Sequence, residues 1–535
     1  MLQRKANLAS LRHRRFDVLI VGGGINGAVA AAALASKGAS VALVDRGDFA
    51  GFTSQHSSNL AWGGIKYMEN YEFPLVRDLC LSRNALIRAY PSTVREIRFL
   101  TTVPRRFRHR PLTMWLGAWA YWLIGNCFTG APRRLSRRAV EREEPLIETS
   151  AGAGFIEYSD AYLHDNDARF VFNFIRSAMD RGAIAVNYVE STGARYEGGG
   201  WRTAALDAES GDEFEIESDI LVNAAGPFAD EHNDLTGVES AHRHVYSKGV
   251  HLLVERMACE RRVLAFFADD GRLFFVIPMG RRTCLGTTDT RVDTPWSEVS
   301  CEDRRFILDN INRRLRLERP LTEADVIAER CGVRPLAVAK GEAGSADFLQ
   351  MSRRHAIDTD ETKRHLTIYG GKLTDCINIG EEICERAKFL GLSSLDTRYR
   401  WYGEPEGAIR KQYFDRAKRM NLDASTPSTS SEGLTDRYWR RYGAAAIELL
   451  ERIEADPRQA DPLIEGTEYT RCEIDLARRR EMIVKLEDFL RRRTKIALMM
   501  RREEIRTADG LQQACEALFG DATSMRIDEY FSSDA

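Results

Sequence analysis

Near its N-terminus the chain reads Phe16-Asp17-Val18-Leu19-Ile20-Val21-Gly22-Gly23-Gly24-Ile25-Asn26-Gly27. An apolar, β-branched run leads through Gly-x-Gly-x-x-Gly into an alanine-rich stretch, an order that predicts a strand, a tight turn and a helix around a dinucleotide. Gly22 would permit the turn, Gly24 would let the backbone approach a pyrophosphate, and Gly27 would let the helix pack closely on the strand. The diphosphate would face the positive N-terminus of that helix.

A second predicted strand follows, Val41-Ala42-Leu43-Val44, and ends at Asp45, whose carboxylate can accept the ribose hydroxyls of an adenosine. Glycine-rich turns alone are common, but the series of strand, glycine motif, helix, strand and terminal acid is far more specific. The series favours a dinucleotide site over a merely structural turn. At this point NAD and FAD are both open as the cofactor.

The composition is that of an ordinary globular protein. The chain has 535 residues, of which 44% are hydrophobic and 29% are charged, enough for two or three domains. A net charge of −2 gives no overall attraction to nucleic acid. The ten cysteines are scattered without Cys-x-x-Cys pairs or metal-ligand spacing, which predicts no metal site and a reduced, cytosolic compartment.

Two segments bear on membranes. Residues 1–15 are basic but lack the apolar core of a secretory signal, and no segment reaches the roughly 18 consecutive apolar residues of a spanning helix. The apolar, aromatic-rich stretch Pro111–Ile124 follows the basic run Arg105–Arg110, a pattern typical of a helix lying in the headgroup layer. A buried helix beneath a basic surface is the alternative. Further basic runs are candidate additions to this surface, although most charge runs are only solvated faces: Arg133-Arg134 with Arg137-Arg138, and Arg491-Arg492-Arg493 with Lys495.

Three further segments point to the cofactor. Hydroxyls and glycines are dense between Gly47 and Tyr67, which suits a loop around a polar ligand, with a solvated loop as the alternative. The predicted strand at Ile220–Asn223 ends in small residues that would let the backbone lie against a dinucleotide. Gly370-Gly371-Lys372-Leu373-Thr374 again joins a strand to a helix, so a second helix N-terminus would lie beside the cofactor and the nucleotide domain would be discontinuous.

The remaining chain divides into a strand-rich and a helical part. Closely spaced β runs in residues 245–350 predict a separate, largely antiparallel sheet that covers the cofactor. The Ser/Thr-rich stretch Asp423–Ser431 predicts an exposed loop or linker. Beyond it the pattern is helical, with a long charged amphipathic segment over Ile474–Met500.

Several of these motifs together resemble one family. The glycine motif, the Gly47–Tyr67 loop, Gly332-Val333-Arg334-Pro335-Leu336, Ser352-Arg353 and Gly370-Gly371-Lys372-Leu373-Thr374 are similar to those of the FAD-dependent, aerobic-type glycerol-3-phosphate dehydrogenases. Arg480-Glu481-Met482 and Leu486–Thr494 resemble the helical C-terminal domain of that family. The resemblance covers nearly the whole chain.

The resemblance implies an α/β fold. A Rossmann-type FAD-binding domain would carry an inserted, largely antiparallel β substrate domain, as in glycine oxidase and D-amino-acid oxidase, and would be followed by an α-helical C-terminal domain. The first two would occupy residues 1–395, with the substrate part mainly in about 70–150 and 230–355, and the helical domain residues 396–535.

The implied reaction is oxidation of sn-glycerol 3-phosphate to dihydroxyacetone phosphate, with reduced FAD reoxidised by membrane quinone. The protein would be cytoplasmic and peripherally associated with the inner face of the membrane, with no nucleic-acid partner. A homodimer is one assembly that the resemblance allows.

A phosphate dianion needs several cations, and arginine suits it because its planar fork donates paired hydrogen bonds. By resemblance Arg334 and Arg353 bind the phosphate, and Lys372 lies between flavin and substrate, where it stabilises the developing alkoxide. His251 is the candidate base, with a purely structural histidine as the alternative. The predicted catalytic residues are His251, Arg334 and Lys372, and the predicted substrate-binding residues are Lys66, Tyr67, His251, Arg334, Arg353 and Lys372.

The predicted cofactor-binding residues come from four segments of the chain. They are Gly22, Gly24, Ile25, Asn26, Gly27, Asp45, Arg46, Thr53, Ser54, Ser57, Ser58, Gly63, Gly64, Ala225, Gly226, Gly371, Lys372, Leu373 and Thr374. His56, in the same loop, is a candidate site of covalent flavin attachment, with a hydrogen-bonded or exposed histidine as the favoured alternative.

Four residues depart from the family pattern. Asn59, Trp62 and Lys66 stand where the family usually has lysine, histidine and arginine, and Asp375 brings a carboxylate to a usually neutral position. That carboxylate would disfavour the anionic reduced flavin. Other interpretations therefore stay open: an oxidase or dehydrogenase for another polyol phosphate or a 2-hydroxy acid, or a non-catalytic flavin-binding redox sensor.

Overall fold

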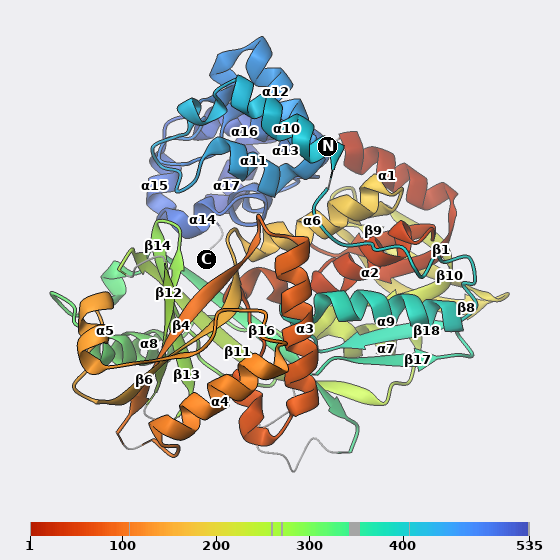
Figure 1. Cartoon of the computed structure of the whole chain (residues 1–535). Helices are drawn as coiled ribbons and strands as arrows, with labels where there is room; N and C mark the ends of the chain where they lie inside the picture. Colours follow the sequence, from red (N-terminus) through yellow and green to blue (C-terminus); the bar gives the residue numbers. More distant parts are fainter. Residues whose placement is uncertain are drawn as a thin grey trace.

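The glycine motif lies at the centre of a mostly parallel sheet (Figure 1). The computed structural model describes residues 2–105, 107–257, 261–268, 271–341, 354–405 and 407–532. In this sheet β1 pairs in parallel with β2 and β10, β2 with β7, and β10 with β18, while β17 pairs antiparallel with β18. The strands are β1 (Arg15–Val21), β2 (Val41–Asp45), β7 (Ile184–Asn187), β10 (Glu213–Asn223), β17 (Ala356–Asp360) and β18 (His365–Tyr369). The hairpin of β8 (Val189–Glu197) and β9 (Gly200–Asp207) extends β10.

Small side chains bring the helices close to this sheet. Residues 28–35 of α2 (Ile25–Ser36) are alanine, valine and leucine, and all are buried. They pack with α6 (Asp167–Asp180) and α9 (Cys376–Phe389) in one core against the sheet. β1 is buried along most of its length, as a central parallel strand covered on both faces must be. The predicted strand, turn and helix are all present, and α9 begins directly after the second glycine motif.

The second sheet is mostly antiparallel and has the order β15-β11-β14-β13-β12-β4-β6-β3, with β16 beside β11 and β5 beside β6. Its strands are β3 (Leu60–Ala61), β4 (Val94–Pro104), β5 (Arg133–Leu135), β6 (Gly152–Leu163), β11 (His242–Glu255), β12 (Arg262–Phe267), β13 (Leu273–Met279), β14 (Arg282–Gly286), β15 (Thr290–Val292) and β16 (Ala328–Ala339). One pair, β4 with β12, is parallel. The helices α3 (Phe73–Ala89), α4 (Pro111–Ile124), α5 (Arg137–Glu143) and α8 (Cys301–Arg314) lie along this sheet (Figure 1).

The C-terminal part is helical and lies across the ends of both sheets, drawn in blue in Figure 1. Its helices are α10 (Ala408–Arg419), α11 (Leu434–Tyr442), α12 (Ala446–Ala455), α13 (Arg471–Arg480), α14 (Ile496–Met499), α15 (Arg502–Thr507), α16 (Leu511–Phe519) and α17 (Thr523–Ser532). Two apolar clusters form its core. The class predicted from sequence is therefore confirmed: a Rossmann-type nucleotide domain, a largely antiparallel β domain and a helical C-terminal region.

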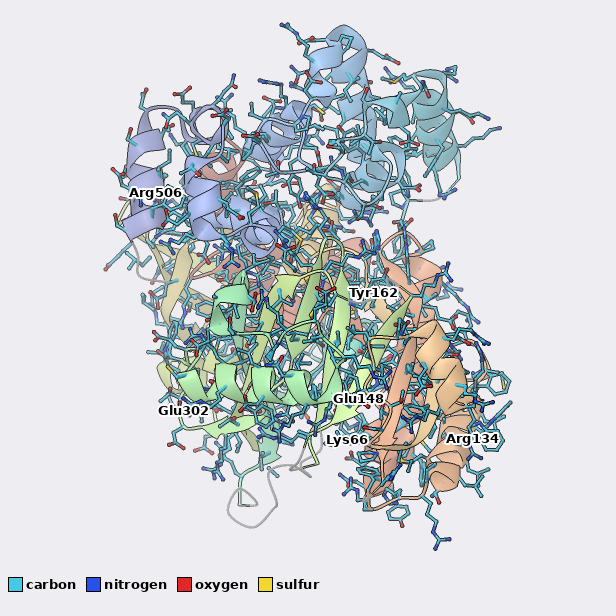
Figure 2. The ribbon with its side chains drawn as sticks, turned by 90° about the vertical axis from the view of Figure 1, so that its left-hand side faces the viewer. Lys66, Arg134, Glu148, Tyr162, Glu302 and Arg506 are labelled. Atoms are coloured by element: carbon cyan, nitrogen blue, oxygen red, sulfur yellow. The ribbon has the colours of Figure 1, made fainter. Side chains whose placement is uncertain are left out.

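The segment Ile474–Met500 differs from the single amphipathic stretch expected. It contains most of α13, a residue with positive φ at Met482, the π-helix η10 (Asp488–Arg493) and α14. Arg492 and Arg493 in this segment pair with the buried Asp48, a contact that the pattern of apolar residues in the sequence does not reveal. Figure 2 shows the C-terminal region, marked by Arg506, at the opposite end of the molecule from Lys66 and Arg134.

Candidate active site

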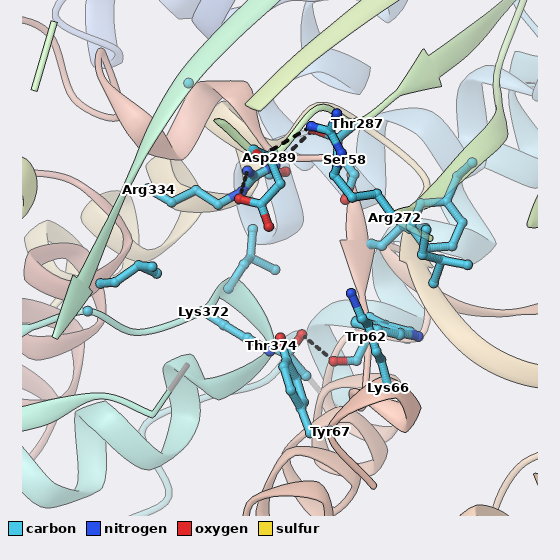
Figure 3. A pocket seen from close by; sticks show the side chains of 18 of the residues that line it. Ser58, Trp62, Lys66, Tyr67, Arg272, Thr287, Asp289, Arg334, Lys372 and Thr374 are labelled. Atoms are coloured by element: carbon cyan, nitrogen blue, oxygen red, sulfur yellow. Dashed lines mark hydrogen bonds and ion pairs between the residues drawn. The ribbon is translucent and has the colours of Figure 1, made fainter. Parts of the chain in front are cut away.

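A cavity of about 960 Å³ opens where the two sheets meet. One side is lined by the serine loop (residues 47–59), by the start of α2 and by the second glycine motif; the other is lined by the second sheet and by η2 (Ile65–Asn70). Figure 3 shows Lys372 and Arg334 reaching into it from one side, with Trp62, Lys66 and Arg272 on the other. Cationic side chains therefore reach the cavity from both sides.

The glycine turn beside this cavity leaves no room for side chains. A Cβ on Gly27 would lie 1.8 Å from the carbonyl oxygen of Gly22, and one on Gly22 would lie 2.4 Å from that of Ala224. Gly22 also has φ of +107°, a conformation that L-residues rarely adopt. Gly24 is the N-cap of α2 and has no side chain, so the positive N-terminus of this helix is open to an anion.

Asp45 holds this turn together. Its carboxylate accepts hydrogen bonds from the amides of Gly23 (2.6 Å) and Gly47 (2.8 Å), while burial raises the pKa of Asp45 to about 7. Beside it the guanidinium of Arg46 lies 3.6 Å from the ring centroid of Phe228 and is flanked by Phe52 and Trp296. These groups mark the end of the site where an adenosine is predicted.

The serine loop forms a large part of the cavity wall. Ser54 Oγ accepts a hydrogen bond from the amide of Ile25 (3.0 Å), and Thr53 Oγ1 donates to the carbonyl of Val333 (2.7 Å). Ser57 donates through its amide (2.9 Å) and its hydroxyl (2.8 Å) to Asp167. These bonds tie the loop to α2, β16 and α6, so its conformation depends on all three elements.

The predicted cofactor residues fall into three groups. Those lining the cavity are Ile25, Thr53, Ser54, Ser57, Ser58, Gly371, Lys372, Leu373 and Thr374. Those at or beside the glycine turn are Gly22, Gly24, Asn26, Gly27, Asp45, Arg46, Ala225 and Gly226. Gly63 and Gly64 lie apart from the turn: Gly63 packs on Tyr121 and Cys80 and donates to Asp160 (3.0 Å). Their part in cofactor binding stays a prediction.

Lys372 and Tyr67 meet inside the cavity. The ammonium group of Lys372 donates a hydrogen bond to the hydroxyl of Tyr67 and lies 3.8 Å from the centroid of its ring, with the ring of Trp62 at 5.9 Å. Thr374 Oγ1 donates to the carbonyl of Trp62 (3.2 Å), which joins the second glycine motif to this aromatic wall (Figure 3). The charge of Lys372 is thus presented to the cavity from a fixed position.

Arg334 enters from β16. Its guanidinium donates to Thr287 Oγ1 (2.9 Å) and lies 3.7 Å from the carboxylate of Asp289. The strand beneath carries Gly249, where a Cβ would lie 2.1 Å from the guanidinium. A glycine at this position therefore lets the arginine lie flat across β11 toward the cavity.

Within the described structure, only two of the other predicted substrate residues line the cavity. Lys66 and Tyr67 line the cavity, whereas Arg353 lies outside the described residues. His251 is buried and outside the cavity lining, and neither ring nitrogen has a hydrogen-bond partner among the described residues. Burial and the charges of Arg334 and Arg330 lower the pKa of His251 well below its ordinary value, so its ring is neutral.

His56, which the sequence offered only as a candidate for flavin attachment, lines the cavity, and burial together with the charge of Arg491 lowers its pKa well below the ordinary value. Arg272, Asp289 and Arg314 also line it and were missed by sequence reasoning. Their sequence surroundings carry no motif, because they come from loops and helix ends that only the folded second sheet brings together.

Two of the departures from the family pattern do not reach the cavity. Asn59 is buried, accepts a hydrogen bond from Arg330 (2.9 Å) and donates to the carbonyl of Asp165 (2.5 Å). Asp375 is bonded to the ring of His355 at 2.5 Å. Trp62 and Lys66 do line the cavity, so these two are the departures that a substrate would meet.

His355 lies between two carboxylates, with Glu382 at 3.0 Å on the other side of its ring. Burial opposes its protonation, but hydrogen bonds to Asp375 and Glu382 raise the pKa of His355 to about 9. The imidazolium therefore compensates the charge of Asp375, which weakens the expected effect of this carboxylate on a reduced flavin.

This pair predicts a pH-dependent stability. Because the folded pKa lies above that of the unfolded chain, the stabilisation is full below about pH 6.5 and is lost as pH rises through about 9. Relative to His355→Gln, the native chain should be more stable by about 3 kcal/mol at pH 6 and by little at pH 10. Unfolding of both proteins across this range measures the gap, and a gap that stays constant would contradict the pairing.

Comparison with known proteins gives the following matches. Residues 17–371 match the family model described as FAD dependent oxidoreductase, and residues 407–520 match that of the C-terminal domain of alpha-glycerophosphate oxidase. The chain is 29% identical over 521 residues to glycerol-3-phosphate dehydrogenase 2 of Mycobacterium tuberculosis, covering 93% of this chain and 83% of the relative. It is 28% identical over 491 residues to D-erythritol 1-phosphate dehydrogenase of Brucella abortus, covering 90% of this chain and 94% of the relative.

Among solved structures, the glycerol-3-phosphate dehydrogenase from Bacillus halodurans complexed with FAD has a similar fold. Its TM-score is 0.67 at 22% identity, and the match covers 99% of this chain and 94% of that one. The resemblance that the motifs predicted is thereby confirmed over almost the full length.

Proposed function

Because this chain belongs to the FAD dependent oxidoreductase family, we propose that it oxidises sn-glycerol 3-phosphate to dihydroxyacetone phosphate and passes the electrons to a membrane quinone. FAD is the cofactor, as predicted from the glycine motif and the resemblance. The glycine turn, the helix end behind it and the serine loop fit a dinucleotide, since each offers close backbone approach or hydrogen-bond donors. When bound, FAD supplies the hydride acceptor for the reaction.

The observation that carries this proposal is the set of cations facing one cavity. Lys66, Arg334 and Lys372 come from three separate segments and line the same space. Several positive charges converging on a small cavity favour an anionic substrate such as a phosphate ester over an amine. The names of the Mycobacterium and Brucella relatives, both dehydrogenases of polyol phosphates, support the same substrate class.

In this proposal each residue has one task. Arg334 binds the phosphate, and Lys372 stabilises the negative charge that develops on the C2 oxygen. His251 accepts the hydroxyl proton as a neutral base, and His56, which lines the cavity whereas His251 does not, is the second candidate. The apolar rings of Trp62 and Phe275 keep water away from the reacting carbon.

A longer polyol phosphate is the second candidate substrate. Arg272 and Arg314 add positive charge to the cavity wall beyond the predicted set, and Trp62 replaces the histidine that is usual in the resembled family. A tetritol phosphate would have the additional hydroxyls and length to reach these side chains. The Brucella relative is named for such a substrate.

Anaerobic mixing of the holoprotein with glycerol 3-phosphate tests the proposal directly. Loss of the oxidised flavin absorption band is the expected result, and an unchanged spectrum would remove this substrate. Repeating the mixing with a tetritol phosphate and with a 2-hydroxy acid ranks the alternatives, and no response to any of them would favour the non-catalytic sensor. Turnover with a soluble quinone, set against hydrogen peroxide formed in air, separates a dehydrogenase from an oxidase.

We also propose that α4 lies on the membrane surface. Leu112, Leu116 and Leu123 on this helix are each more than half exposed, whereas Ala118 and Tyr121 of the same helix are buried. Basic side chains at Arg105, Arg108 and Arg110 precede the helix on the exposed surface. Apolar side chains with cations beside them suit a headgroup layer containing anionic lipid. None of the helices among the described residues combines the length and apolarity needed to cross a bilayer.

Leu116→Asp should lower binding to vesicles containing anionic lipid at least tenfold, because it places a carboxylate in the apolar face of the helix. Cosedimentation with vesicles measures this. Leu235→Asp is the matched control, since Leu235 on α7 (Ala229–Thr236) is 49% exposed but belongs to a different helix. Equal binding by the native chain and the Leu116 variant would contradict the proposed surface.

A further inference from the structure

The C-terminal region contains three consecutive arginines that turn inward. Arg491, Arg492 and Arg493 form the end of η10 and are only 6%, 3% and 1% exposed. The expectation that this run belongs to a basic membrane surface is therefore wrong, because the run is buried. Removing three guanidinium groups from water costs several kcal/mol for each unless partners compensate. The partners therefore indicate what these arginines do.

Two of the arginines share one carboxylate of the serine loop. Arg493 donates two parallel hydrogen bonds to Asp48, at 2.7 and 2.8 Å, and Arg492 Nε donates a third at 2.7 Å. Asn187 donates a fourth (2.8 Å). Although burial raises the pKa of Asp48, the charges of Arg493 and Arg492 outweigh this and hold it below the ordinary value. Asp48 is therefore an ionised anchor at the beginning of the loop.

The third arginine reaches the middle of the same loop. Arg491 donates a hydrogen bond to the carbonyl oxygen of Gln55, which lies between the cavity-lining residues Ser54 and His56. The Arg491 side chain belongs to the C-terminal region and the carbonyl to the nucleotide domain. The contact therefore joins η10 to the backbone of the wall that faces the cofactor.

The start of α6 holds the loop and the arginine segment together. The side-chain amide of Asn166 donates to the carbonyls of Arg491 (2.8 Å) and Thr494 (2.7 Å). The next residue, Asp167, accepts the two hydrogen bonds from Ser57. The N-terminal end of α6 thus binds both η10 and the serine loop. The loop is held at three residues: Asp48, Gln55 and Ser57.

We propose that Arg491, Arg492 and Arg493 are positioning residues of the FAD site: by holding Asp48 and Gln55 they keep the serine loop in the conformation that presents its hydroxyls to the cofactor. The C-terminal region thereby completes a site to which it contributes no lining residue within the described chain. By thermodynamic linkage, FAD must then stabilise the docking of η10 as much as docked η10 favours FAD.

The affinity of the full-length protein for FAD tests this without any substrate, so the result does not depend on the proposed reaction. Arg491→Gln and Arg493→Gln should each raise the Kd for FAD at least tenfold, measured from the flavin fluorescence released on dilution of the holoprotein. Combining Arg493→Gln with Asp48→Asn should add little to the larger single effect, because both remove the same contact.

Arg437→Gln is the matched control. Arg437 is as buried as Arg493 and is paired with Glu473, but both partners belong to the C-terminal helices and neither contacts the serine loop in the described structure. This variant should lower the unfolding temperature while leaving the Kd for FAD within about twofold. If it raised the Kd as much as Arg493→Gln, or if the loop variants bound FAD with native affinity, the positioning role would be overturned.

Hydrogen exchange of the native chain covers the case in which Arg493→Gln does not fold. Adding FAD to the apoprotein should slow amide exchange in residues 485–495 as well as in the serine loop, since linkage acts in both directions. Protection restricted to the nucleotide domain would show that η10 is independent of the cofactor and would overturn the proposal.

Discussion

Replacing Lys372 with methionine is expected to slow reduction of bound FAD by glycerol 3-phosphate by about 10²- to 10³-fold, the usual cost of removing one group that stabilises developing negative charge. The ammonium group of Lys372 is hydrogen-bonded to Tyr67 on the cavity wall, and the residue directly follows Gly371 in the motif predicted to meet the flavin. Methionine keeps much of the length and apolar surface of the lysine stem but carries no charge. Stopped-flow absorbance under anaerobic conditions measures the rate.

Lys363→Met provides the control for this substitution. The ammonium group of Lys363 donates to the carbonyl of Gly237 (2.7 Å) in an exposed setting outside the cavity lining. Its loss should leave the rate of flavin reduction within about twofold of the native value. If FAD bound to Lys372→Met were reduced by glycerol 3-phosphate as fast as FAD bound to this control, Lys372 would have no role in the chemical step.

The sequence predicted those parts of the fold that depend on residues close together in the chain. The strand, glycine turn and helix from Arg15 to Ser36 follow from a continuous apolar run, from glycines that alone fit the turn, and from small side chains that allow close packing. The order of the second sheet could not be read in this way. Its β4 and β12 pair in parallel although more than 150 residues separate them, and no local pattern specifies such a partner.

The candidate site divides along the same line. Lys372 and Arg334 lie in short motifs with recognisable spacing, and both line the cavity. The effects of Asp375 and of Arg491–Arg493 were wrongly predicted, because the sequence gives the sign of each charge but not the residue with which it pairs. His355 compensates the first and Asp48 binds two of the others, and both pairings depend on residues that only the fold brings together.

Replacing Arg334 with methionine is expected to raise the KM for glycerol 3-phosphate about 100-fold, equivalent to about 2.7 kcal/mol, with a smaller change in kcat. A guanidinium that binds a phosphate with paired hydrogen bonds contributes mainly to binding, and lysine cannot reproduce the fork, so Arg334→Lys should recover only part of the loss. Steady-state kinetics with an artificial acceptor measures both parameters. Arg243→Met, on the exposed end of β11, is the control and should leave KM unchanged.

Gly249→Ala tests the same contact without altering the arginine. The added Cβ would lie within 2.5 Å of three guanidinium atoms, so Arg334 must move, and a flexible side chain can do so without unfolding the strand. KM should therefore rise about tenfold while the Kd for FAD stays near the native value, whereas Gly117→Ala, where the new methyl group meets open space, should alter neither. A KM that was native in both Gly249→Ala and Arg334→Met would mean that the phosphate binds elsewhere, and the cations at Lys66, Arg272 and Arg314 would then be the remaining described candidates on the cavity wall.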